Sequence, residues 1–144
     1  MTPWERLTAA LADDGNRHGP DRACVPVSVA GGRVRRLWIE RSGEGFRCTL
    51  YGNTVALVVS TGTVDVTASG HFTPSTRDAL SWIIAGHDQA ASLSTPGSRG
   101  GDRRGRPWEL ILYPRNGRYS EGQRYALTDT DPYGWITIPA EAFA

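Results

Sequence analysis

The basic residues of this 144-residue chain include no lysine, because all 16 of them are arginine. Fifteen acidic residues leave a formal net charge of only +1, so the chain lacks the large positive excess of a general polyanion binder. We attribute the arginine bias to codon usage in a GC-rich genome, such as that of an actinobacterium or its phages. The alternative is a set of bidentate contacts to phosphates or carboxylates, for which arginine is well suited.

Cysteine and long apolar runs are scarce as well. The two cysteines, Cys24 and Cys48, are too few for a disulfide framework or a zinc site, and a strand meander would hold them roughly 9–10 Å apart, too far for a disulfide. No apolar run approaches the roughly 20 residues of a membrane span, and the N-terminus has no signal-peptide pattern. We therefore expect a cytoplasmic protein with reduced thiols and no membrane partner.

The residues present predict one domain over 1–144 with an α+β fold; the alternative is a domain break within residues 89–107. Thr2, Pro3 and Glu5 match the start of an N-terminal helix, and a central helix is expected at about 75–86, capped by Thr73 or Ser75. Alternating apolar residues predict short strands around 25–29, 34–41, 46–51, 55–59, 64–66, 108–113, 123–128 and 135–138. The expected architecture is a mainly antiparallel sheet of about seven or eight short strands with these two helices.

Residues 51–84 have the strongest pattern and should organise the core. They form two apolar strands around Thr61 and Gly62, then a polar segment, then the central helix. Their expected inward residues are Val55, Leu57, Val59, Val64, Val66, Leu80, Ile83 and Ile84. In contrast, residues 89–107 have no periodicity and are rich in Gly, Ser and Arg, which is typical of a flexible loop.

Part of this central stretch resembles a short domain of unknown function that is scattered among bacteriophage proteins. That family has a Tyr-x-Asn-Thr strand, a hairpin and a Gly-Gly-Trp-x-Thr-x-Thr-Thr segment before a helix. Tyr51, Asn53 and Thr54 match the strand, and residues 69–76 (SGHFTPST) align with the second motif, with Ser69 in place of the first Gly and a histidine in place of Trp. The resemblance covers about a quarter of the chain and implies a phage or prophage origin, not an activity.

No catalytic, cofactor or metal site is recognisable in the sequence. The three histidines lie far apart and lack partners at metal-binding spacing. His71 lies near Ser69, Thr73 and Ser75, but no nucleophile motif accompanies it, so helix capping or packing is the simpler interpretation. A small hydrolase or transferase with a site near His71 is kept as a third hypothesis.

Clustered arginines are the main functional signal. The candidate binding residues are Arg33, Arg35, Arg36 and Arg47 on adjacent strands, and Arg99, Arg103, Arg104 and Arg106 in the expected loop. The leading hypothesis is a non-enzymatic phage or mobile-element accessory protein, a monomer or homodimer, that binds a host or phage macromolecule through arginine and aromatic residues. A protein partner is favoured because a net charge near zero fits a specific interface. The alternative is a DNA- or RNA-binding module that uses the same arginines.

Overall fold

The structure is a computed structural model that describes residues 2–13, 15–30, 32–69, 73–84, 91–94, 108–112, 123–127 and 134–143. In chain order its elements are α1 (Pro3–Ala12), β1 (Arg22–Ala30), β2 (Arg33–Ser42), β3 (Gly45–Leu50), β4 (Asn53–Val59), β5 (Val64–Val66), α2 (Pro74–Ile84), β6 (Ala91–Ser94), β7 (Trp108–Leu112), β8 (Gln123–Leu127), β9 (Ile136–Ile138) and the 3-10 helix η2 (Ala140–Phe143). This order confirms the α+β class with an N-terminal and a central helix.

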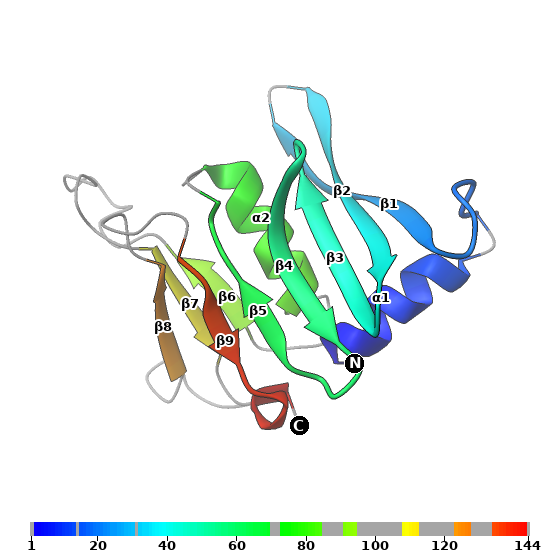
Figure 1. Cartoon of the computed structure of the whole chain (residues 1–144). Coiled ribbons are helices and arrows are strands. Elements are labelled where there is room, and N and C mark those ends of the chain that lie inside the picture. Colours follow the sequence, from blue (N-terminus) through cyan, green and yellow to red (C-terminus); the bar gives the residue numbers. More distant parts are fainter. Residues whose placement is uncertain are drawn as a thin grey trace.

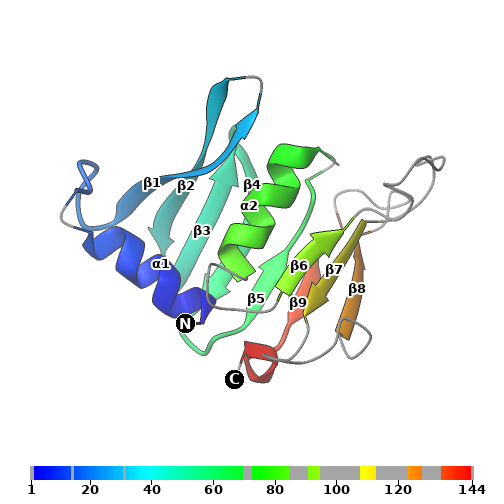
Figure 2. The same cartoon turned by 180° about the vertical axis from the view of Figure 1, so that it is seen from behind.

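The strands in the described part of the chain form two antiparallel sheets. Six strands lie in the order β1-β2-β3-β4-β5-β9, and β6-β7-β8 make a second, smaller sheet. Figures 1 and 2 show both α-helices on one face of the six-stranded sheet, with β6 beside α2. Among the described residues no helix covers the opposite face, which is turned toward the viewer in Figure 1.

α1 begins at the capping box that the sequence predicts. The Thr2 hydroxyl accepts a hydrogen bond from the Glu5 N–H at 3.2 Å, and the Glu5 carboxylate accepts in return from Thr2. Pro3 occupies the first turn, where its missing N–H has no helical partner to lose. The helix then buries Leu7 and Leu11 in the core.

α2 is stabilised at both ends by side chains. At its start, the Thr73 hydroxyl accepts from the Thr76 N–H at 3.3 Å, as a capping residue should. Its last turn has no basic residue of its own. Instead the nearly buried Arg6 of α1 donates from Nη1 to the carbonyls of Ile83 (2.6 Å) and Trp82 (3.2 Å). A cation from another element therefore satisfies the carbonyl end of α2.

The core follows the predicted stripe except along β4. Buried as expected are Val55, Val64, Val66, Leu80, Ile83 and Ile84. The prediction was wrong for Leu57, which is half-buried, and for Val59, which is 39% exposed. A β-bulge in the β3–β4 pair leaves Val55 without a partner on β3. After the bulge, Ala56 and Val58 are the buried residues of β4. The bulge reverses the alternation that the sequence pattern assumes.

Residues 91–94 form β6 and were expected in a loop. β6 pairs with β7 from Ala91 opposite Leu112 to Ser94 opposite Glu109. The expectation of an irregular segment is wrong for these four residues, because pairing with β7 supplies hydrogen bonds that the local composition does not signal. The other residues of that segment lie outside the described residues, and within the described ranges neither α-helix has the length and apolar character needed to cross a bilayer.

Both cysteines are free, as expected. The Cα partner of Cys24 on β2 is Trp38, whereas that of Cys48 is the next residue, Ile39. Because successive strand residues face opposite sides of a sheet, the two thiols lie on opposite faces.

Candidate partner-binding surface

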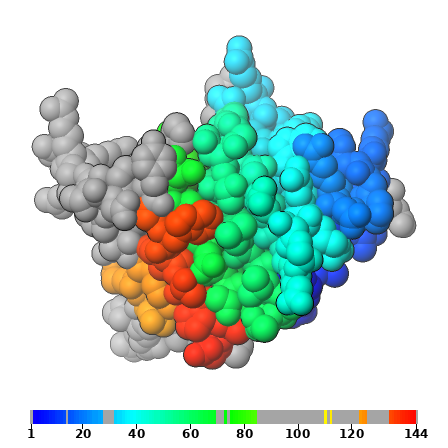
Figure 3. Space-filling model, viewed as in Figure 1, coloured from blue at the N-terminus to red at the C-terminus, as the bar shows by residue number. Residues whose placement is uncertain are grey.

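The β1–β2 hairpin extends beyond the rest of the six-stranded sheet. β1 and β2 pair over their whole length, but β3 pairs with β2 only from Trp38 to Ser42. Residues 25–30 and 33–37 therefore form a two-stranded ribbon, which we call the arm. Figure 1 shows the arm standing past the end of β3, and Figure 3 shows it projecting from the molecular surface.

The arm carries three of the predicted binding arginines. Arg33 and Arg36 are exposed and Arg35 is half-buried. Within the described residues, no ion pair or hydrogen bond neutralises Arg33, Arg36 or Arg47. Residues 22–39 contain four arginines and no acidic residue. The arm is thus a positively charged projection without an acid of its own.

The other predicted arginines are not brought to the arm by the described structure. Arg47 is exposed on β3, and its Cα partner on β2 is Glu40. Glu40 lies four residues beyond Arg36 on β2, which corresponds to roughly 13 Å along the strand. The loop arginines Arg99, Arg103, Arg104 and Arg106 lie outside the described residues.

Trp38 on the uncovered sheet face is already packed by polar neighbours. The guanidinium carbon of Arg22 lies 4.1 Å from the centre of its ring, and the His18 ring packs edge-on at 4.9 Å. Arg22 also pairs with Glu40 at 3.1 Å. This stack occupies the ring face that a nucleic-acid base would need, so Trp38 does not supply the stacking platform that the nucleic-acid hypothesis calls for.

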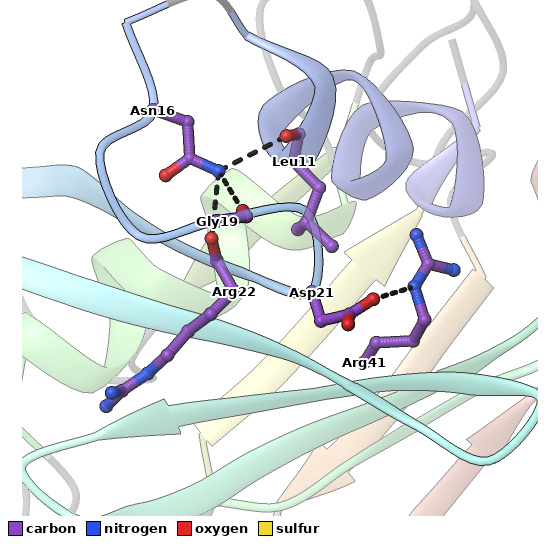
Figure 4. Close-up of polar contacts among 6 residues, drawn as sticks. All are labelled: Leu11, Asn16, Gly19, Asp21, Arg22 and Arg41. Atoms are coloured by element: carbon purple, nitrogen blue, oxygen red, sulfur yellow. Dashed lines mark hydrogen bonds and ion pairs between the residues drawn. The ribbon is translucent and has the colours of Figure 1, made fainter.

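The free edge of β1 is partly closed to another strand. The Arg41 N–H donates a hydrogen bond to the Asp21 carbonyl, so Asp21 and Arg41 are a hydrogen-bonded pair that continues the β1–β2 ladder. Because such pairs alternate with non-hydrogen-bonded ones, Arg22, Cys24 and Pro26 direct their main-chain groups away from β2, toward the free edge. The Asn16 amide donates to the Arg22 carbonyl at 2.8 Å, one of the three carbonyls that it bridges in Figure 4. Pro26 has no N–H to offer. Both features reduce pairing at this edge.

Tyr51 and Gly52 form the two-residue turn between β3 and β4, closed by the pair Leu50 and Asn53. Their φ angles of 53° and 79° lie in the left-handed region, as a type I′ turn requires. This region costs an L-residue roughly 1–2 kcal/mol, so tyrosine is an unfavourable choice. Nevertheless the Tyr51 side chain is 60% exposed, and the Arg35 guanidinium lies over its ring at 5.5 Å. An exposed aromatic ring is thereby fixed at the base of the arm.

A pocket of about 110 Å³ lies beside this turn. Its lining residues are Leu50, Tyr51, Asn53, Val55, Ala68, Ser69, Thr73 and Thr76. Ser69 has a φ of 54°, and among the described residues it and Tyr51 are the non-glycine residues with positive φ. Both strained residues therefore line the same pocket. The dipeptide Tyr51-Gly52, in a two-residue hairpin loop, could have indicated the strained conformation of Tyr51 from the sequence. No local pattern indicates Ser69, which only tertiary packing brings beside Tyr51.

Two of the exposed apolar side chains, Val34 and Tyr51, lie at the arm. Within the described part of the chain, the large ones are Val34 (47%) on the arm, Tyr51 in the turn, Trp135 (47%) and Val59 (39%). Trp135 directly precedes β9, which begins at the end of the sheet where β4 also begins (Figure 1). Val59 lies at the other end of β4. Of the four, only Val34 and Tyr51 therefore lie near the unpaired charges of the arm.

The described residues bring together no catalytic constellation. A larger groove of about 770 Å³ runs along β1 and α1, lined in part by Asp13, His18 and Arg36. In the described ranges no group of three or more His, Cys, Asp or Glu side chains could hold a metal ion. His71 and His87 lie outside the described residues, so the hypothesis of an enzyme site near His71 stays a prediction.

Comparison with known proteins gives no match to a family model, to a curated protein or to a solved structure. The resemblance of residues 51–76 to the phage domain therefore stays a prediction.

Proposed function

We propose that this chain is a non-enzymatic binding protein that engages an acidic surface of a partner protein through the arm and the Tyr51 turn. The observation that carries the proposal is the exposed Tyr51 ring, held in a strained turn under Arg35. The unpaired Arg33 and Arg36 lie on the same strand as Arg35. Tyrosine and arginine are the residue types that most often dominate the binding energy of protein interfaces.

The strain at Tyr51 supports this interpretation. Asparagine or glycine would satisfy the turn without the cost of a left-handed tyrosine. The Tyr51 ring does not recover that cost by burial, since most of its surface is exposed. Strained residues cluster at functional sites, where the surrounding structure holds them in place. A role outside the fold itself, namely contact with a partner, accounts for the presence of tyrosine at this position.

A phage or mobile-element origin completes the proposal. Its support is the all-arginine basic composition and the resemblance of residues 51–54 and 69–76 to a phage domain. An accessory protein of this kind binds either a host protein or another protein of the phage.

A second candidate is nucleic-acid binding by the arm. One specific observation favours it: a two-stranded ribbon fits the major groove of DNA, and residues 22–39 contain no acidic residue to repel phosphates. Against it stand the net charge of +1 and the covered face of Trp38. With only three arginines on the arm, the logarithm of the affinity should fall with the logarithm of salt with a slope no steeper than about −3.

A capture experiment with nuclease distinguishes these candidates. The immobilised chain is exposed to lysate of the organism that carries the gene, with and without nuclease, and to generic duplex DNA at about 50 mM salt, where phosphate contacts are strongest. The proposal predicts a protein that is retained after nuclease treatment and no DNA binding. Retention that disappears with nuclease, together with DNA binding at low salt, would replace the first candidate by the second.

A variant pair ties the captured protein to the arm. Arg33→Gln combined with Arg36→Gln removes two positive charges from the arm. Arg17→Glu changes the net charge by the same amount on an exposed residue near the other end of β1, and is the matched control. The proposal predicts that capture is lost only with the arm variant. Equal capture by all three proteins would exclude the arm as the binding surface.

A further inference from the structure

We infer that the pocket beside Tyr51 binds one leucine or isoleucine side chain of an acidic segment of the partner protein. This inference rests on the proposed function and adds to it the chemistry that the site selects. The pocket and the arginines of the arm recognise different parts of the same segment: an apolar side chain enters the pocket, and an adjacent carboxylate contacts Arg35.

The volume of the pocket sets the size of the apolar group. A 150 Å³ protein cavity accommodates benzene, which corresponds to roughly 25 Å³ per carbon atom. The pocket of about 110 Å³ therefore holds about four carbon atoms at that ratio. Leucine and isoleucine side chains have four carbons, alanine has one, and a phenylalanine side chain is too large.

The lining of the pocket combines apolar and polar residues. Leu50, Val55 and Ala68 are apolar and nearly buried, at 3%, 2% and 2% exposure, and supply the apolar part of the lining. Asn53 and Ser69 add an amide and a hydroxyl to the lining. An apolar pocket with a few polar groups is the usual composition of a site that binds and orients a small group.

Arg35 supplies the charge preference. Its guanidinium lies 5.5 Å from the Tyr51 ring centre, and its Nε is buried without a hydrogen-bond partner among the described residues. A guanidinium that is partly removed from water gains more from a carboxylate than a fully exposed one does. Arg33 lies on the same face of β2 as Arg35 and extends the positive field, and Arg36 adds a charge on the opposite face. An acidic residue next to the leucine is thus favoured, and a basic one is repelled.

The backbone around the pocket is held ready for binding. Tyr51 is fixed by the β3–β4 hairpin, and Ser69 donates its N–H to the Thr67 hydroxyl at 3.1 Å. Both residues keep left-handed φ angles that cost a non-glycine residue roughly 1–2 kcal/mol each. Because these residues need not become ordered on binding, less conformational entropy is lost. Even a short peptide should then bind tightly enough for its affinity to be measured.

The direct test is an NMR titration of the full chain with capped tripeptides. The probe is acetylated and amidated Glu-Leu-Glu, and the two comparison peptides are Glu-Ala-Glu and Lys-Leu-Lys. We expect Glu-Leu-Glu to shift the amide signals of Val55, Ala68 and Ser69 with millimolar affinity, and both comparison peptides to bind at least tenfold more weakly. Absence of these shifts at about 10 mM Glu-Leu-Glu, or equal shifts with Glu-Ala-Glu, would overturn the inference.

Two variants separate this inference from the proposed function. Ala68→Leu fills the pocket with a larger side chain. Tyr51→Asn removes one wall of the pocket, and asparagine suits the left-handed turn better than tyrosine. The Tyr51 variant therefore keeps the test valid if Ala68→Leu does not fold. Both should lower the affinity for Glu-Leu-Glu at least tenfold. Unchanged peptide binding by Tyr51→Asn refutes the pocket inference alone, whereas unchanged partner capture by the Arg33/Arg36 variant refutes the proposed function.

Discussion

At the scale of single residues, Arg6 connects the two helices. It is only 8% exposed and its Nη1 donates to two carbonyls at the end of α2. Replacing Arg6 with Met keeps the aliphatic part of the side chain but leaves both carbonyls without this donor. We expect the free energy of unfolding, measured by urea denaturation, to fall by about 2–4 kcal/mol.

Arg77 provides the control for Arg6. It forms an ion pair with its neighbour Asp78 at 3.3 Å, and both side chains are more than a third exposed. Arg77→Gln should therefore change the free energy of unfolding by less than about 1 kcal/mol. If Arg6→Met is no more destabilising than Arg77→Gln, Arg6 does not stabilise the end of α2.

Cys48 should make the stability depend on pH in the alkaline range. Burial raises the pKa of its thiol from 9.0 to about 12. Unfolded chains release this proton above pH 9 while folded chains keep it, so the stabilisation is complete below pH 9 and is lost as the pH rises toward 12. Between pH 9 and about 12, the unfolding free energy of the unmodified chain should therefore fall by about 1.4 kcal/mol per pH unit because of Cys48. We expect Cys48→Ala to lose this part of the pH dependence. An equal fall in the Cys48→Ala variant and in the unmodified chain would contradict this account.

At the scale of elements, the β2–β3 turn offers a matched pair of glycines. A Cβ added at Gly45 would collide with the carbonyl of Val58 on β4, whereas one added at Gly43 meets open space but has a φ of 58°. Gly45→Ala should therefore cost about 3 kcal/mol, and Gly43→Ala about 1 kcal/mol. Thermal and urea denaturation of both variants measure the difference. A larger cost for Gly43→Ala would contradict the close contact between Gly45 on β3 and the Val58 carbonyl on β4.

Elements with a local signal could be predicted from the sequence, and those that depend on distant partners could not. The Thr2 capping box and the alternation in β5 are local, and both appear as expected. The bulge at Val55 depends on how β3 and β4 pair, so Leu57 and Val59 were assigned to the wrong face. β6 depends in the same way on β7, far along the chain.

The candidate surface shows the same division. Arginine counts were enough to select Arg33, Arg35 and Arg36, because charge can be read directly from composition. That these three stand on a projecting arm follows from the length of β3, which the sequence does not define sharply. The pocket beside Tyr51 requires the turn, Ala68 and Ser69 after β5, and the start of α2 to meet, so no sequence pattern indicates the pocket.

At the scale of the whole molecule, the near-zero net charge conceals an uneven distribution. Residues 15–52 contain seven arginines and three acidic residues, a formal charge of +4, so the rest of the chain carries −3. Three of these arginines, Arg33, Arg35 and Arg36, lie on the arm, which also carries the exposed Val34 and has the exposed Tyr51 at its base. A specific, oriented contact with an acidic protein surface is the binding mode that this distribution favours over uniform attraction to polyanions.

The most direct test of the central claim is the affinity of the captured protein for three forms of this chain, measured by calorimetry at one fixed salt concentration. The arm variant with Gln at positions 33 and 36 should bind at least tenfold more weakly than the unmodified chain, because two arginines of the contact lose their charge. Its unfolding free energy should stay within about 0.5 kcal/mol, since both side chains are exposed and unpaired in the described structure. Arg17→Glu, with the same change in net charge, should bind within twofold of the unmodified chain. Equal weakening by both variants would show that only net charge matters, and equal affinity of all three would show that the arm does not bind the partner.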